Sequence, residues 1–234
     1  MNCSDKITRE QLCRMFDHTN LKAYADKDML QTLCEEAKEN HCAMVAINSS
    51  PVSYCKELLK DTDIHVGAAI SFPLGQTTVA AKVFEAQNAI ENGADEIDYV
   101  INIGELKNKN YQYIESEMKA MVELCRSNKV ISKVIFEICY LTEDEIKKVS
   151  EIAKKVKPDY IKTSTGFGTS GAVKEIVRLM KNCVGEDVKV KAAGGIRSWK
   201  TCAEMIDAGA ERIGTISTIK ILQEFDEVRA GKSI

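Results

Sequence analysis

The feature that most constrains the fold of this chain is an alternation of short apolar strand patterns with helical patterns. The strand pattern occurs eight times, at residues 15–19, 43–48, 65–70, 96–102, 133–138, 159–163, 188–193 and 211–216. Eight strands that alternate with helices in 234 residues predict an α/β fold, a closed (β/α)8 TIM barrel. An open, doubly wound sheet is the alternative, but no G-x-G-x-x-G turn follows the first strand.

Helical patterns fill the segments between the predicted strands. Clear amphipathic spacing is present at residues 77–93, 110–128 and 142–157. The last of these begins with a capping-box pattern, which Thr142 forms with Glu145. No linker or break in composition divides the chain. We therefore expect a single domain over residues 1–234, with a helical lead-in at about 5–14 and the barrel at about 15–229.

Composition and charge argue against several classes of partner. The chain is 44% hydrophobic and 29% charged, and its formal net charge is -3 with no block of lysine and arginine. A sequence-independent grip on nucleic acid phosphates is therefore not expected. No apolar run approaches the ~20 residues that a membrane span needs, so we expect no membrane contact.

The cysteines indicate a reducing compartment. There are nine of them, an odd number, and no Cys-x-x-Cys pair occurs. Several stand inside apolar segments, as Cys139 does, where cysteine acts as a small hydrophobic residue. The first ten residues are polar and lack the apolar core of a signal peptide. These features predict a cytoplasmic location.

Ionisable residues stand near the ends of two predicted strands, where a barrel of this kind carries its active site, and inside a third. Lys162 is in the sixth strand, Lys191 in the seventh and Asp98 in the fourth. Side-chain alternation directs both lysines into the barrel, since the intervening residues suit the covering helices. Two neighbouring ammonium groups repel and burial desolvates them, so the pKa of a lysine falls there. A neutral amine is the nucleophile that Schiff-base chemistry requires.

A structural interpretation of the same lysines is the alternative. A lysine in a strand can pair with a carboxylate, or it can extend its ammonium group to solvent along an apolar surface. Two lysines on adjacent strand ends, with an inward-facing aspartate, make the catalytic interpretation more attractive than one lysine would. The pattern alone does not choose between them.

Glycine-rich turns follow the last three predicted strands. They contain Gly166 after the sixth strand, Gly194 and Gly195 after the seventh, and Ser217 at the start of the last helix. Barrel enzymes commonly hold phosphate at the loops after strands seven and eight, where backbone N–H groups and a helix N-terminus favour an anion. Glycines at such turns also occur without any ligand, so the pattern indicates a phosphate site without requiring one.

Five motifs together resemble one known family. In chain order they are "DHTNLK", "FPLGQTT", "GADEIDYVINIG", "IKTSTGF" and "KAAGGIR", and the match runs from about residue 17 to 217. This set is similar to deoxyribose-phosphate aldolase, a family of class I aldolases with a (β/α)8 fold. The resemblance implies reversible cleavage of 2-deoxy-D-ribose 5-phosphate in deoxyribonucleoside breakdown. It also implies a small phosphorylated sugar as substrate, no metal or other cofactor, and a homodimer as a common assembly.

The resemblance implies a role for each matching residue. Lys162 would form the Schiff base, and Lys191 would keep Lys162 nucleophilic. Asp98 would relay protons through water, and Asp17 would belong to the same polar network, whereas His18 is expected to be structural. The positions that match the binding site for the sugar phosphate are Gly166, Gly194, Gly195, Gly214 and Ser217.

Three departures from the family pattern stand out. Ala46 and Ile47 occupy the strand position where many members carry a cysteine, and Ile216 replaces the first of two serines at the last phosphate loop. No tyrosine follows Tyr160, although some members end in one. There are two alternative functions. One is an enzyme of the same kind that acts on another phosphorylated aldehyde or ketose, and the other is a protein that binds a sugar phosphate without catalysis.

Overall fold

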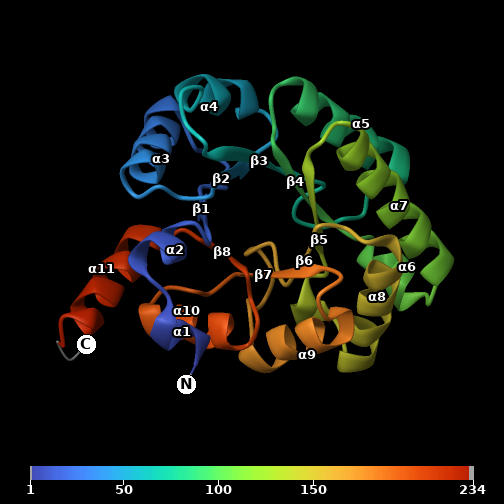
Figure 1. Cartoon of the computed structure of the whole chain (residues 1–234). Coiled ribbons are helices and arrows are strands. Elements are labelled where there is room, and N and C mark those ends of the chain that lie inside the picture. The colour runs from blue at the N-terminus through green and yellow to red at the C-terminus, as the bar shows by residue number, and fades with distance from the viewer. Residues whose placement is uncertain (1, 232–234) are drawn as a thin grey trace.

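The computed structural model describes residues 2–231 and contains a closed barrel of eight parallel strands (Figure 1). Each strand pairs with its neighbours in chain order, and the pairing of the last strand with the first closes the barrel. The strands are β1 (Phe16–Thr19), β2 (Met44–Asn48), β3 (His65–Ile70), β4 (Glu96–Val100), β5 (Ile131–Ile135), β6 (Tyr160–Lys162), β7 (Lys189–Ala193) and β8 (Arg212–Thr215). The predicted fold class is confirmed.

Helices surround the barrel (Figure 1). They are α1 (Cys3–Lys6), α2 (Arg9–Cys13), α3 (Lys27–Glu39), α4 (Val52–Leu58), α5 (Val79–Glu91), α6 (Ile103–Lys107), α7 (Tyr111–Ser127), α8 (Glu143–Val156), α9 (Lys174–Val184), α10 (Trp199–Asp207) and α11 (Thr218–Arg229), with a 3-10 turn, η1, at Ile138–Tyr140. The three helices predicted in detail correspond to α5, α7 and α8, and the capping box of α8 is present. Within residues 2–231, no helix has both the length and the apolar character that crossing a membrane requires.

The two faces of the strands have opposite chemistry. Side chains such as Ile97, Val134 and Ile161 are fully buried in the apolar layer between the barrel and its helices. The residues that alternate with them, such as Asp98 and Lys162, are charged and also buried. Since alternate side chains of a strand point to opposite faces, these charges fill the inside of the barrel. The fold therefore concentrates ionisable groups on its axis.

The fifth strand differs most from its prediction. It was expected at residues 133–138 but ends at Ile135, because Glu137 takes a left-handed backbone conformation with φ of 55°. The chain then enters the 3-10 turn η1 instead of continuing as a strand. The fourth strand likewise ends two residues early, at Val100, and Asn102 caps the helix that follows.

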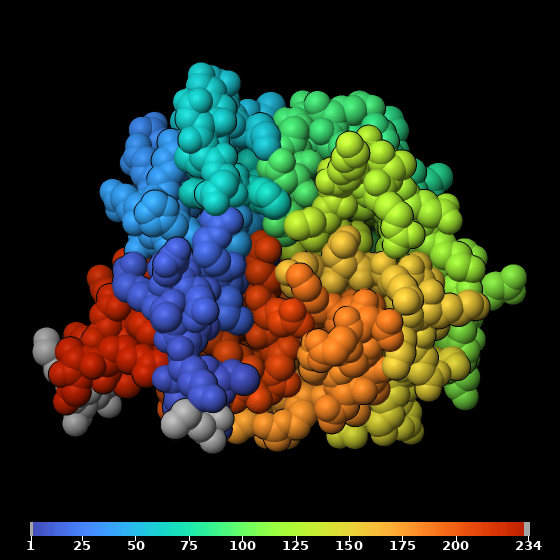
Figure 2. Space-filling model, in the orientation of Figure 1, coloured from blue at the N-terminus to red at the C-terminus, as the bar shows by residue number. Residues whose placement is uncertain are grey.

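The two ends of the chain pack against each other. Ser4 donates from its N–H and its hydroxyl to the carboxylate of Asp207, at 2.9 and 2.8 Å. Arg229 in α11 donates to the backbone oxygen of Ser4 at 2.9 Å. Figure 2 shows the N-terminal segment, in blue, lying against the C-terminal segment, in red. The lead-in helices α1 and α2 therefore pack against α10 and α11, respectively.

Candidate active site

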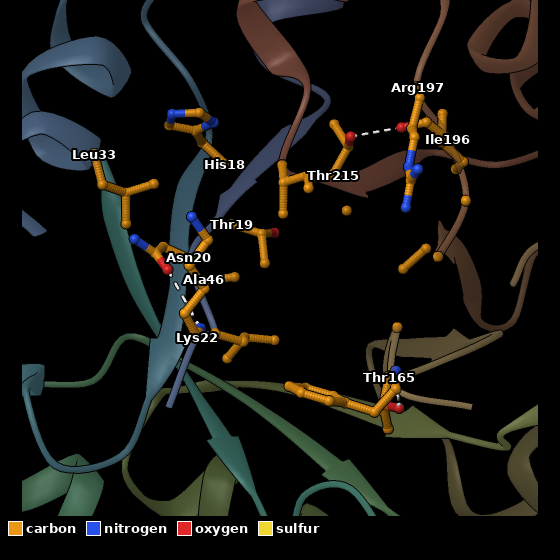
Figure 3. A pocket seen from close by; sticks show the side chains of 18 of the residues that line it. His18, Thr19, Asn20, Lys22, Leu33, Ala46, Thr165, Ile196, Arg197 and Thr215 are labelled. Carbon is orange, nitrogen blue, oxygen red and sulfur yellow. Dashed lines mark hydrogen bonds between the residues drawn. The ribbon is translucent and has the colours of Figure 1, made fainter. Parts of the chain in front are cut away.

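A cavity of about 500 Å³ opens at the carboxyl ends of the strands, as the barrel rule predicts. Its wall comes from the loops after β1, β6, β7 and β8 and from one face of α3 (Figure 3). Of the predicted site residues, the ones that line it are Lys162, Gly166, Gly194, Gly195 and Gly214. Asp98, Lys191 and Asp17 are 4%, 0% and 0% exposed and lie beneath this lining, inside the barrel.

Lys162 lies between the charged interior of the barrel and the cavity, and it lines the cavity. It is the last residue of β6 and is only 4% exposed. Its Nζ donates to Oδ2 of Asp98 at 2.7 Å. Lys191 is the register partner of Lys162 on β7 and donates to the same Oδ2 at 2.6 Å. The two lysines therefore approach each other as the sequence predicted, and a single carboxylate oxygen is shared between them.

A third lysine, Lys133, completes the contacts of Asp98. It lies opposite Asp98 on β5 and donates to Oδ1 at 2.8 Å. Lys133 also forms an ion pair with Glu96, which is fully buried. Both oxygens of Asp98 are thus occupied by ammonium groups.

Asp17 belongs to this network, as expected. Its Oδ1 accepts a hydrogen bond from Nε of Arg212 at 2.7 Å, and its Oδ2 forms an ion pair with Lys191. Arg212 also donates to Oε1 of Glu96 at 3.1 Å. Three carboxylates therefore face four cations in one continuous cluster, so one cation is in excess.

Lys162 binds its proton more weakly than an ordinary lysine does. Burial lowers the pKa of Lys162 to about 8, and the charges of Lys191 and Lys133 act in the same direction against Asp98. At pH 7 a pKa near 8 means that Lys162 is a free amine in roughly a tenth of the molecules. Burial alone would raise the pKa of Asp98, but the three lysines hold it well below its usual range. Asp98 is therefore an anion beside an amine that is partly neutral at pH 7.

Sequence reasoning missed three members of the cluster, Lys133, Glu96 and Arg212. A signal was present, because Glu96 alternates with Asp98 on β4 and both side chains must point into the barrel. Arg212 is the register partner of Lys191. Two cations on the cavity wall, Lys22 and Arg197, were also missed, although both stand in the quoted motifs (Figure 3).

The predicted glycines have different surroundings. Gly166 and Gly195 line the cavity with φ of 95° and 75°, and nothing lies within 4 Å of where a Cβ would stand. Their backbone is therefore open to a ligand. A Cβ on Gly194 would stand 2.9 Å from Cα of Gly171 in the preceding loop. One on Gly214 would lie 3.1 Å from Cε of Lys191, so this glycine leaves room for the lysine side chain.

Ser217 precedes the first turn of α11, as predicted, but does not line the cavity. Its N–H donates to Oγ1 of Thr215 at 2.9 Å. Thr215 and Ile216 line the cavity instead, and Ile216 is 64% exposed. The ring of His18 is held between two helices by Thr218 and Glu36, at 2.9 and 2.7 Å, in agreement with a structural role.

A buried lysine with a lowered pKa, at the carboxyl end of a (β/α)8 barrel, suits an enzyme whose nucleophile is an amine. Residues 12–224 match the model of the DeoC/LacD family aldolases, and the chain belongs to this family. It is 58% identical to deoxyribose-phosphate aldolase of Lactobacillus acidophilus over 218 residues, which are 93% of this chain and 92% of the relative. The enzyme of the same name from Thermococcus kodakarensis is 48% identical, over 93% of this chain and 98% of the relative.

A solved structure supports the same assignment. Deoxyribose phosphate aldolase from Aeropyrum pernix superposes with a TM-score of 0.89 at 27% identity, covering 96% of this chain and 95% of that one. That protein is described as a tetramer. The family resemblance drawn from the five sequence motifs is thus confirmed.

Proposed function

We propose that this chain is a deoxyribose-phosphate aldolase. It cleaves 2-deoxy-D-ribose 5-phosphate reversibly into D-glyceraldehyde 3-phosphate and acetaldehyde. The observation that carries the proposal is Lys162, an amine with a pKa near 8 that contacts Asp98 and borders a cavity of about 500 Å³. The names of the curated relatives agree with this substrate.

Lys162 begins the reaction as the nucleophile. The free amine attacks C1 of the open-chain aldehyde, and loss of water leaves an iminium ion between C1 and Nζ. Because burial, together with the charges of Lys191 and Lys133, lowers its pKa, Lys162 supplies a neutral amine more readily than an exposed lysine would. The positive iminium nitrogen then provides the electron sink for the next step.

Asp98 handles the protons of bond cleavage. When the C2–C3 bond breaks, its electrons move to the iminium to form an enamine, and the C3 hydroxyl loses its proton through water to Asp98. The low pKa of Asp98 means that this proton is passed on and not retained. Protonation of the enamine at C2 and addition of water then release acetaldehyde and restore the Lys162 amine.

The loops after β6 and β7 suit the phosphate. Gly166 and Gly195 present open backbone to the cavity there. Arg197, labelled in Figure 3, adds a positive side chain. Ile216 provides no hydroxyl where the family often has a serine, so we expect backbone N–H groups and cations to contribute most of the phosphate binding. Holding the phosphate fixes C1 next to Lys162.

Chemical trapping tests the central claim. The protein is incubated with acetaldehyde and borohydride, digested and examined by peptide mass spectrometry. We expect a stable two-carbon adduct on Lys162, and none at that position in Lys162→Arg, whose always-charged guanidinium cannot add to a carbonyl. Labelling elsewhere only, or no labelling, would sink the claim.

A coupled assay tests the substrate. With 2-deoxy-D-ribose 5-phosphate, the release of glyceraldehyde 3-phosphate is followed through a coupling dehydrogenase. Trapping on Lys162 without this turnover would favour another phosphorylated aldehyde or ketose. Binding of the sugar phosphate without trapping or turnover would favour a binding protein.

The assembly and the location stay predictions from the sequence. A homodimer is expected, and the relative from Aeropyrum pernix is described as a tetramer. Light scattering on the purified full chain distinguishes these assemblies. Fractionation of cells that produce the untagged chain tests the cytoplasmic location.

A further inference from the structure

Glu137, just beyond the end of β5, combines two unfavourable features. Its backbone is left-handed, with φ of 55° and ψ of 64°, a conformation that side chains with a Cβ rarely adopt. Its carboxyl group is buried, with only 1% of the residue exposed. Strained backbone and buried charge at the carboxyl end of a barrel strand indicate a function, because stability alone would favour glycine or an apolar residue.

The surrounding backbone fixes Glu137 to the strand that carries Lys162. The N–H of Phe136 donates to the carbonyl oxygen of Lys162 at 3.0 Å. The N–H of Ile138 donates to the carbonyl oxygen of Thr163, also at 3.0 Å. Glu137 is therefore held on both sides, and its side chain is directed toward the loop that follows β6.

The carboxylate of Glu137 binds one residue of that loop with both oxygens. Oε1 accepts a hydrogen bond from the N–H of Thr165 at 3.1 Å, and Oε2 accepts one from the Thr165 hydroxyl. The hydroxyl oxygen in turn accepts from the N–H of Phe167 at 3.0 Å. Burial raises the pKa of Glu137, and the bonds from Thr165 oppose that rise. Three linked hydrogen bonds thus fix the turn at residues 165–167.

This turn forms the cavity wall beside Lys162. Thr165, Gly166 and Phe167 all line the cavity, and Figure 3 shows Thr165 on the side opposite His18. Within residues 2–231, the N–H of Gly166 has no hydrogen-bond acceptor, and the space in front of this glycine is open. The turn therefore offers a free donor to an anion, at a position that the hydrogen bonds from Thr165 to Glu137 determine.

We propose that Glu137 is a positioning residue, which holds Thr165 and thereby aims the Gly166 N–H at the phosphate of the substrate. The proposal rests on the proposed function for the identity of that substrate. Glu137 does not touch the reacting atoms. It acts through Thr165, so its removal weakens binding of phosphorylated ligands more than it slows the chemical step.

Steady-state kinetics with 2-deoxy-D-ribose 5-phosphate test this assignment. In Glu137→Gln an amide group faces two donors of Thr165, so KM is expected to rise about 10-fold, with a smaller change in kcat. Thr165→Val removes the hydroxyl and is expected to raise KM by a similar factor. Because both changes break the same contact, the double variant is expected to show no larger rise than either single variant.

Glu117→Gln is the matched control. Glu117 is also fully buried and accepts a backbone hydrogen bond, from Asn102 at 3.0 Å, but it does not line the cavity. A purely structural effect would raise KM equally in both glutamine variants. That result, or additive effects of the Glu137 and Thr165 changes, would overturn the proposal. If Glu137→Gln does not fold, the KM of Thr165→Val is compared with that of Glu117→Gln, and an equal rise in both overturns the proposal.

Binding of inorganic phosphate, measured by titration calorimetry, separates this proposal from the proposed function. If the wild-type protein does not turn over the sugar phosphate, the proposed function is disproved. The positioning role still requires that Glu137→Gln weaken phosphate binding about 10-fold. Unchanged phosphate affinity in that variant contradicts the role, whatever the substrate is.

Discussion

Two buried groups of charged side chains in this molecule contain lysines that differ in their partners and in their access to the cavity. One is the cluster inside the barrel that ends at Lys162. The other is a single pair outside the barrel, Lys82 in α5 and Glu117 in α7, both of which are fully buried. Nζ of Lys82 donates to Glu117 and to the backbone oxygen of Val100, each at 2.6 Å. This pair anchors the end of β4.

The comparison shows that a lowered pKa does not by itself make a lysine a nucleophile. Burial lowers the pKa of Lys82 as well as that of Lys162. Lys82, however, has a carboxylate of its own and no exposed surface, whereas Lys162 shares its carboxylate oxygen with Lys191 and opens on a cavity. Access to the cavity and a shared carboxylate therefore distinguish Lys162, the proposed nucleophile, from Lys82.

The largest expected effect is on turnover at Lys162. Lys162→Met removes the nucleophile, so kcat is expected to fall at least ~10⁴-fold. The coupled release of glyceraldehyde 3-phosphate measures this, and circular dichroism confirms folding. Activity within tenfold of wild type would contradict the role of Lys162 in the comparison.

The next effect is on stability at Lys82. Lys82→Met leaves Glu117 buried without a counter-charge, and the free energy of unfolding is expected to fall by about 3–5 kcal/mol. Urea denaturation measures the loss. The double variant Lys82→Met with Glu117→Leu should recover much of it, because no charge is then buried. An unchanged midpoint in the single variant would show that the pair is not structural.

Lys162→Met is expected to have the opposite effect on stability. Since the folded pKa of about 8 lies below the unfolded value of 10.5, the folded chain holds this proton less tightly than the unfolded chain. Burying the charged form therefore destabilises the wild type below about pH 8, and this penalty disappears as the pH rises toward 10.5.

Removing Lys162 also balances the cluster, with three cations left for three carboxylates. We expect unfolding at pH 7 to require about 1–3 kcal/mol more in Lys162→Met than in wild type. The gain should shrink in alkaline buffer. Equal or lower stability at pH 7 would mean that Lys162 is not the surplus cation.

The smallest expected effect is a shift in pH dependence. kcat/KM of the wild type should rise with pH through about 8, as Lys162 loses its proton. Lys191→Met removes a charge that lowers the pKa of Lys162, so the rising limb should move to higher pH. A full pH–rate profile of both proteins measures the shift. An unchanged rising limb in Lys191→Met would show that Lys191 does not lower the pKa of Lys162.

The site was predictable where it depended on strand order and alternation. Lys162 and Lys191 fall on consecutive strands, and counting by two from their apolar neighbours directs both inward. Lys133 was not found, because the fifth strand was expected to begin at this residue and instead begins at Ile131. That error places Lys133 at the entrance of the strand, whereas it lies level with Asp98.

The glycine turns show a second limit of the sequence. Gly194 and Gly214 were assigned to phosphate binding, but each also leaves space that a neighbour occupies, Gly171 and Lys191 respectively. Contacts between separate loops depend on register and on side-chain volume, which no single turn encodes. Glu137 was likewise expected to extend a strand. Its left-handed backbone could not be predicted locally, because its two chain neighbours form hydrogen bonds to β6 and to the residue after it.

The pairing of β1 with β8 has a consequence for how the protein is made. Synthesis proceeds from the N-terminus, so β1 leaves the ribosome long before the strand that pairs with its outer edge. Asp17 obtains its partner Arg212 only when the chain is nearly complete. The nascent chain therefore carries an open strand edge through most of translation, and Asp17 lacks its Arg212 partner for as long. The last strand to emerge completes both the sheet and the charge cluster.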